Sequence, residues 1–294
     1  MAVIPNLSTL PPLRDVIALH DLSARKSLGQ NFLLDLNITR RIVQAAGPLE
    51  DRPTIEIGPG PGGLTRALLE AGARPVIAVE RDPRCIDALA GLKRVAGGSL
   101  HLVQQNAIEF DPAPFATEFG PLTIVANLPY NIATSLLILW LKKIELFGRM
   151  VLMFQSEVAE RLVASPGTKA YGRLSVATQW RCDVRPVLTL PARAFTPAPK
   201  VDSTVVTITP RAEPLAKADG AALETVVAAA FSQRRKMLRS SLKGLFNNAN
   251  ITLTDAGIDP TARAETIDIE GFCSLARAYK RETKLTFTAT REDV

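Results

Sequence analysis

The stretch EIGPGPGGLT, residues 56–65, decides the fold, because it joins the end of one predicted strand to the start of a predicted helix. The apolar run TIEIG (54–58) leads into it, and GGLTRALLEAGA (62–73) follows with the apolar periodicity of an amphipathic helix. Its glycines have the G-x-G-x-x-G spacing of nucleotide-binding turns: Gly58, Gly60 and Gly63. A structural tight turn would explain the glycines alone, so the motif needs support from the rest of the chain.

Short apolar segments alternate with helical segments after this turn. We predict strands at 75–80, 100–105, 122–126, 149–155, 175–180 and 203–210, and helices at 83–95 and 134–144. This alternation is typical of an α/β fold, in which a mostly parallel sheet is covered by helices on both faces. In such sheets ligands bind at the carboxyl ends of the strands.

The pattern changes after PRAEP (210–214), where the chain reads as helices with short breaks. We therefore predict two domains: 1–210, of which 1–25 form an N-terminal extension, and a small all-helical domain at 211–294. In the second domain we predict one helix with an apolar face of Phe231, Leu238, Leu242 and Leu245 and a basic face of Arg235, Arg239 and Lys243. The basic face is either solvated or in contact with RNA.

The composition restricts the partners and the chemistry. The 294 residues carry a net charge of +6, which favours a polyanionic partner without requiring one. Three well-separated cysteines and two histidines give no metal-ligand spacing, so we expect reduced thiols and no metal. No apolar stretch approaches the roughly 20 residues of a membrane-spanning helix, and the N-terminus lacks the pattern of a secretion signal. These features predict a cytoplasmic protein with no membrane partner.

The residues around the glycines favour a particular kind of nucleotide cofactor. Pro59 and Pro61 lack the backbone N–H groups that would hold a pyrophosphate, and Glu56 would place an acid beside it. A cofactor with an adenosine, a positive charge and no phosphate fits better, and S-adenosylmethionine has these properties. Glu80 closes the second strand and is predicted to bind the ribose hydroxyls, while Asn106, after the third strand, is predicted to meet the adenine.

The sequence ANLPYN (126–131) follows the fourth predicted strand and is therefore expected beside the methyl donor. If the acceptor is the exocyclic amine of adenine, two oxygens that accept its N–H groups would direct the nitrogen lone pair at the methyl group. We assign these oxygens to the side chain of Asn127 and to the backbone carbonyl of Leu128, which Pro129 leaves free. Tyr130 is predicted to stack on the base. The alternative is an Asn-capped turn, in which the proline ends the strand and the tyrosine packs in the core.

Eight motifs in one order, between Leu22 and Tyr279, resemble those of the ribosomal RNA adenine dimethyltransferases. They are KSLGQNFLLD (26–35), EIGPGPGGLT (56–65), VERD (79–82), NLPYNI (127–132), FQSEVAERL (154–162), YGRLSV (171–176), FTPAPKVDS (195–203) and FSQRRKMLRSSL (231–242). The resemblance implies a Rossmann-like class I S-adenosylmethionine-dependent methyltransferase with a small C-terminal helical domain. The chain is most similar to the bacterial small-subunit branch, which dimethylates the N6 amines of two adjacent adenosines near the 3′ end of 16S rRNA. We expect a monomer that acts on rRNA in an assembling 30S particle.

The resemblance also implies roles that the patterns alone do not reveal. The implied cofactor-binding set is Asn31, the backbone of Leu33, Gly58, Glu80, Asn106 and Asn127, with Asn31 and Leu33 forming a lid over the methionine part. Phe195 would face the target base opposite Tyr130, or else its ring packs against the neighbouring prolines. Asn106 departs from the family, which usually has aspartate there, so we expect weaker or altered cofactor binding. The predicted RNA-binding residues are Arg234, Arg235, Lys236 and Arg239.

Three alternatives stay open on the sequence. A large-subunit rRNA dimethyltransferase of the antibiotic-resistance type would usually read NIPY or NIPF and would lack the QRRKMLR segment (233–239). A DNA adenine-N6 methyltransferase shares the Asn-Pro-aromatic chemistry but has no reason to carry the other motifs. A non-catalytic RNA-binding assembly factor would keep the fold, and replacing Asn127 with alanine would separate it from an enzyme.

Overall fold

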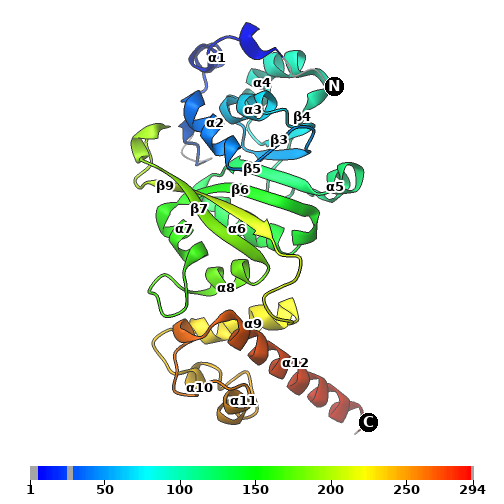
Figure 1. Ribbon diagram of the computed structural model, residues 1–294, viewed down its shortest axis with the longest axis vertical. Helices are drawn as coiled ribbons and strands as arrows, with labels where there is room; N and C mark the ends of the chain where they lie inside the picture. The colour runs from blue at the N-terminus through cyan, green and yellow to red at the C-terminus, as the bar shows by residue number, and fades with distance from the viewer. Residues whose placement is uncertain (1–5, 25–28, 293–294) are drawn as a thin grey trace. The chain divides into compact units, whose positions relative to one another are not determined.

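The computed structural model describes residues 6–24 and 29–292, with side chains described as far as residue 283. These residues form two compact units (Figure 1). The first unit runs to Ala159 and resumes at Asp183–Pro210. The second comprises Glu160–Cys182 and the chain from Arg211 onward.

The second unit therefore contains a segment, 160–182, that lies before the single predicted boundary at residue 210. Tyr171 and Val176 of this segment are buried among the core side chains of the later helices, which explains why the segment belongs with them. A single boundary at residue 210 does not assign this segment to the second unit. The contacts that place it there join residues distant in sequence, and the local pattern contains no signal of them.

A seven-stranded sheet is the centre of the first unit, with the strand order β4-β3-β2-β5-β6-β9-β7. Its strands are β2 Thr54–Ile57, β3 Val76–Glu80, β4 Leu100–Gln104, β5 Leu122–Asn127, β6 Phe147–Gln155, β7 Cys182–Leu190 and β9 Ser203–Pro210. Strands β2 to β6 pair in parallel, and β9 is antiparallel to β6. This confirms the mostly parallel sheet, and the strand order reverses between β2 and β5, where such sheets bind ligands.

The helices of the first unit follow the strands as expected for this architecture. They are α1 Leu13–Leu19, α2 Leu36–Gln44, α3 Gly63–Glu70, α4 Pro83–Ala96, α5 Ala113–Phe119 and α6 Tyr130–Leu141, and α7 Ser156–Val163 leads out of the unit. All residues of β2 and β3 are buried, because both faces of the central strands are covered. A separate two-stranded antiparallel pair, β1 Phe32–Leu33 and β8 Phe195–Thr196, joins the segment before α2 to the segment before β9.

Two predictions of secondary structure are wrong. Residues 175–180, predicted as a strand, lie largely in helix α8 Arg173–Gln179, where Ser175 Oγ accepts the Gly172 N–H at 3.0 Å and donates to the Arg161 carbonyl at 2.6 Å. The strand lies just after it, as β7. The local bond to Gly172 and the bond to Arg161, which lies 14 residues earlier, favour the helix over the strand that the β-branched composition suggested.

The helix predicted through 231–245 is also interrupted. The helices of the second unit are α8, α9 Gly220–Ser232, α10 Leu238–Ser241, α11 Ala249–Asp255 and α12 Ile269–Glu292. Between α9 and α10 the chain turns, because Met237 forms a β-bridge with Arg263 and the Leu238 N–H binds the Ala262 carbonyl at 2.8 Å. Leu238 and Leu242 are nevertheless fully buried, as predicted for the apolar face.

Candidate active site

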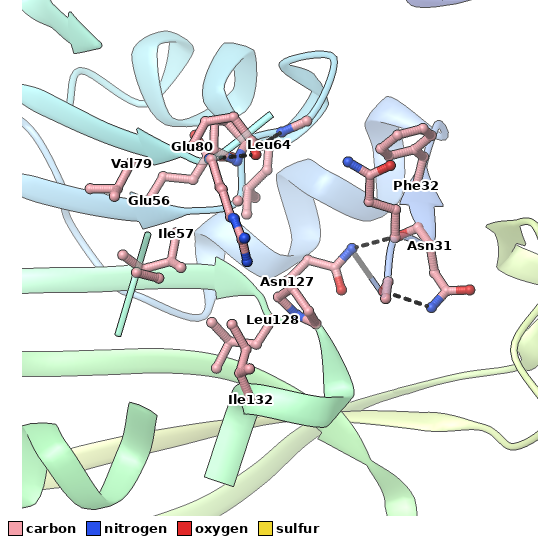
Figure 2. Close-up of a pocket in the computed structure, with 18 of the residues that line it drawn as sticks. Asn31, Phe32, Glu56, Ile57, Leu64, Val79, Glu80, Asn127, Leu128 and Ile132 are labelled. Carbon is pink, nitrogen blue, oxygen red and sulfur yellow. Dashed lines mark hydrogen bonds between the residues drawn. The ribbon is translucent and has the colours of Figure 1, made fainter. Parts of the chain in front are cut away.

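A cavity of about 220 Å³ lies at the carboxyl ends of β2, β3, β4 and β5 (Figure 2). The structure brings nearly all of the predicted cofactor and catalytic residues together around it: Asn31, Leu33, Gly58, Glu80, Asn106, Asn127, Leu128, Pro129 and Tyr130. These residues come from five separate stretches of the chain. The strand pattern alone places four of those stretches at one edge of the sheet.

The glycine turn between β2 and α3 has a backbone that other residues would strain. Gly58, Gly60 and Gly62 have φ angles of 68°, 56° and 94°, in the left-handed region. A Cβ on Gly60 would lie 3.1 Å from the Phe32 ring, and one on Gly62 would lie 2.7 Å from the Leu89 side chain. The turn therefore keeps its backbone close to the cavity.

Glu80, at the end of β3, ties this turn to the start of α4. One carboxylate oxygen, Oε2, accepts the Gly60 N–H at 3.1 Å, and the other accepts the N–H groups of Arg81 and Asp82 at 2.8 Å each. Burial raises the pKa of Glu80, and the three N–H donors oppose that rise. Because Oε2 accepts only one of these bonds, it has acceptor capacity left for a ligand hydroxyl.

Glu56 is a buried carboxyl on β2 whose Oε2 atom has no hydrogen-bond partner among the described residues. Burial raises its pKa to about 8, an effect that the nearby Thr65 hydroxyl reduces and the charge of Glu80 increases. Figure 2 shows Glu56 and Glu80 on neighbouring strands at the same cavity. A buried carboxyl with one oxygen left without a partner is suited to a cation, since leaving a buried polar atom unpaired is costly.

Asn127 ends β5, and its amide has a defined orientation. Its Nδ2 group donates to the backbone carbonyl of Asn31 at 3.2 Å, as the dashed line in Figure 2 marks. A carbonyl can only accept, so this bond turns the amide nitrogen toward Asn31, and the Asn127 oxygen is the amide atom that can accept from a ligand.

The segment that holds this amide is itself packed against the motif that follows Asn127. The Asn31 side chain donates to the Gly29 carbonyl at 3.3 Å. Gly29 has a φ of +65°, and a Cβ there would lie 2.8 Å from Asn131 Oδ1 and 3.4 Å from Pro129. Only a glycine fits between these groups without a shift.

Tyr130 begins helix α6 and is half-buried at the cavity. Its hydroxyl is 2.6 Å from the Ser203 hydroxyl, and Ser203 is fully buried at the start of β9. Burial raises the pKa of Tyr130, and the bond to Ser203 opposes the rise. The hydrogen bond at the hydroxyl therefore fixes the position of the ring. Because Tyr130 is only half-buried and lines the cavity, it is not a tyrosine enclosed in the core.

Phe195 is the one predicted catalytic residue that the structure does not bring to the cavity. Its ring is 3% exposed, lies in the core cluster of the first unit and belongs to β8, which pairs with Leu33 of β1. Its contribution in this conformation is to support the strand that carries Leu33. Ser203 and Gly29 shape the site but were not in the predicted set, because Tyr130 and Asn131, which they contact, are far away in sequence. Glu56 was expected only as an acid beside the glycine turn.

The four predicted RNA-binding residues differ in their surroundings. Arg235, Lys236 and Arg239 are exposed. Arg234 instead donates to Glu265 at 2.8 Å and to the Lys169 carbonyl at 2.6 Å, so its guanidinium joins two parts of the second unit. No local sequence signal distinguishes it from its neighbours.

The described part of the chain offers neither a metal site nor a membrane-spanning helix. Within it, no cluster of three or more His, Cys, Asp or Glu side chains is arranged to hold a metal ion. None of its helices is long and apolar enough to cross a membrane. The three cysteines are buried, and none of them forms a disulfide.

Comparison with known proteins gives consistent matches over most of the chain. Residues 21–281 match the family described as ribosomal RNA adenine dimethylase. The chain is 60% identical over 269 residues to the ribosomal RNA small subunit methyltransferase A of Rhodospirillum rubrum, covering 92% of each chain. It is 54% identical over 278 residues to the protein of the same name from Ruegeria pomeroyi, covering 94% of this chain and 99% of the other.

Two solved structures share the fold. A dimethyladenosine transferase from Plasmodium falciparum superposes with a TM-score of 0.72 at 26% identity, covering 85% of this chain and 97% of that one. The 23S rRNA methyltransferase ErmE superposes with a TM-score of 0.64 at 29% identity, covering 85% and 100%.

Proposed function

The chain belongs to the ribosomal RNA adenine dimethylase family, and we propose that it transfers methyl groups from S-adenosylmethionine to the N6 amines of two adjacent adenosines near the 3′ end of 16S rRNA. Relatives at 53–60% identity, which cover more than nine-tenths of the chain, are named small-subunit methyltransferases. The large-subunit enzyme among the solved structures is 29% identical. This difference favours the small-subunit substrate over the large-subunit alternative.

The orientation of Asn127 is the observation that carries the proposal. Its oxygen is left free at the cavity because its nitrogen is bound to Asn31. An amine of adenine is a poor nucleophile, since its lone pair is delocalised into the ring. Oxygen acceptors at Asn127 and at the Leu128 carbonyl would bind its two N–H groups and direct the lone pair away from the ring plane.

The cavity fits S-adenosylmethionine in its charges as well as its position. When bound, the cofactor supplies an electrophilic methyl group on a sulfonium. Glu80 Oε2 would accept from a ribose hydroxyl, and Asn106 would meet the adenine. Glu56, buried with a free oxygen, would pair with a positive group of the methionine part. The prolines of the glycine turn remove the donors that a phosphate would need.

Position and electrostatics supply the remaining catalysis. Tyr130 would stack on the extruded base, with its ring held by Ser203. No histidine belongs to the cavity lining that the structure describes, and the reaction does not need a strong base, because the methylated amine is acidic. Asn127 and Leu128 therefore act by orienting the amine rather than by removing its proton.

The proposed partner is the small-subunit rRNA within an assembling 30S particle. The net charge of +6 and the exposed Arg235, Lys236 and Arg239 support a polyanionic partner. We further propose that the enzyme works as a cytoplasmic monomer, in agreement with the sequence prediction.

Replacing Asn127 with alanine tests the function. The parent, Asn127→Ala and the surface control Asn37→Ala are each incubated with labelled methyl donor and undermethylated small subunits, and modified nucleotides are mapped. We expect label on two adjacent adenosines, a loss of about a hundredfold or more in rate for Asn127→Ala, and unchanged RNA binding. Full activity of Asn127→Ala would refute the orienting role, and label on large-subunit RNA alone would favour the alternative. RNA binding by the parent without any label would indicate an assembly factor.

A further inference from the structure

Asn106 and Glu109 form a hydrogen-bonded pair in the turn after β4. Asn106 Nδ2 donates to Glu109 Oε1 at 3.2 Å, and Asn106 Oδ1 accepts the Ile108 N–H at 3.2 Å. The turn is closed by the Asn106 carbonyl, which accepts the N–H groups of Glu109 and Phe110 at 3.0 and 3.1 Å. Asn106 lines the main cavity, and both members of the pair line a shallow hollow that continues from it.

An asparagine at this place presents a problem of recognition. The edge of adenine that carries the amino group has a donor, the N6 amine, beside an acceptor, N1. An aspartate can only accept, so it has one way to meet that amine. An asparagine amide can take two orientations, with either its oxygen or its NH2 group toward the adenine. In the second orientation two NH2 groups, both donors, would face each other and could form no hydrogen bond.

Glu109 removes this ambiguity. Its carboxylate can only accept, so it draws the Nδ2 group of Asn106 toward itself, while the Ile108 N–H can only donate and draws the oxygen. Both neighbours select the same orientation of the amide. The oxygen keeps a second lone pair, which is free to accept from a ligand.

We propose that Glu109 is a positioning residue for cofactor recognition, which orients the Asn106 amide so that its oxygen accepts from the amino group of the cofactor's adenine. The inference rests on the proposed function, because it assumes S-adenosylmethionine in the cavity. Asn106 supplies the acceptor, and Glu109 supplies the negative charge three residues later. Together they do what a single aspartate at 106 would do.

A simpler interpretation is that the pair only stabilises the turn after β4. In that case, removing the Glu109 carboxylate would lower the stability of the turn and change the affinity for different purines by the same factor. Discrimination between purines is therefore the measurement that separates the two interpretations.

The experiment uses calorimetric binding of S-adenosylhomocysteine and of S-inosylhomocysteine, whose C6 oxygen and N1–H reverse the pattern at that edge. The variants are Glu109→Met, which keeps the length of the side chain but not its acceptors, Asn106→Asp, and the double variant. Glu118→Met, at another exposed glutamate of the same unit, is the control. Thermal unfolding of each variant reports stability independently of binding.

We expect the parent to prefer the adenosyl ligand and Glu109→Met to lose about fivefold of that preference, since an Asn106 amide that is free to reverse can also pair with the C6 oxygen. Asn106→Asp should keep the preference, and adding Glu109→Met to it should cause no further loss. Equal changes for both ligands in Glu109→Met, or the same loss in the aspartate background, would overturn the inference alone. A parent that binds neither ligand would remove the proposed function and this inference with it.

Discussion

Replacing Glu56 with glutamine should make the cofactor-free protein more stable than the parent at neutral pH. At mildly acidic pH the two proteins should be close in stability. The pKa of Glu56 rises from 4.5 to about 8 on folding because the carboxyl is buried. Between these two values the folded state therefore binds one more proton than the unfolded state. The parent loses stability as pH rises through this window, and glutamine, which does not titrate, abolishes the loss.

The size of the effect follows from the width of the window. One proton of difference changes the free energy of unfolding by about 1.4 kcal/mol per pH unit. From pH 5.5 to 7.5 the parent should therefore lose about 2.5 kcal/mol that the variant keeps, because titration is incomplete at both ends of the range. Near pH 5.5 both side chains are neutral, so the two proteins should be close in stability.

The assay is urea-induced unfolding, monitored by tryptophan fluorescence. The protein has two tryptophans, Trp140 in the first unit and Trp180 in the second, so a Trp180→Phe background leaves a reporter of the unit that contains Glu56. Glu118→Gln, at an exposed glutamate of the same unit, should leave the pH dependence unchanged. Parallel pH slopes for the parent and Glu56→Gln would refute the reasoning, since they would mean that the buried carboxyl already has a compensating partner.

Three further predictions follow from the site and the second unit. Binding of S-adenosylmethionine between pH 6 and 7.5 should release close to one proton from Glu56, and calorimetry in buffers of different ionisation enthalpy should show that the release is absent in Glu56→Gln. Tyr130→Phe and Ser203→Ala should each slow methyl transfer about fivefold without changing cofactor affinity. The double variant should be no slower than either single variant, because both substitutions remove the same hydrogen bond. Additive losses of rate in the double-mutant cycle would contradict this. Arg235→Ala should reduce by about one unit the slope of the logarithm of RNA affinity against the logarithm of salt concentration. Arg234→Ala should leave that slope unchanged and lower the unfolding temperature. Salt titrations and thermal unfolding of both variants measure these effects.

The sequence predicts the architecture of the first unit well where the information is local. The strands around residues 54–58 and 122–126 are short, apolar and bounded by turn residues, and the glycines between β2 and α3 need positive φ angles. Because parallel strands end at one edge of a sheet, these local features also placed Glu80, Asn106 and Asn127 around one cavity.

Most of what the residue pattern does not reveal depends on contacts between residues distant in sequence. Arg234 has the same local context as Arg235, and its bonds to Glu265 and to the Lys169 carbonyl, both distant in sequence, give it a structural role. The helix predicted through 231–245 is broken by a bridge from Met237 to a later loop. The resemblance implied that Phe195 faces the base, with packing against the neighbouring prolines as the alternative, and pairing of β8 with β1 places its ring in the core.

The hydrogen bond from Asn127 to Asn31 joins residues 96 positions apart. The orientation of the Asn127 amide, which is proposed to bind the target amine, therefore depends on the short segment that begins at Gly29. A small molecule that moved this segment away from Pro129 would free the amide to rotate, and it would also disturb the predicted donor site, because Asn31 and Leu33 of the same segment line the cavity. Resistance through a substitution at position 29 would require a side chain on a left-handed backbone, with φ at +65°.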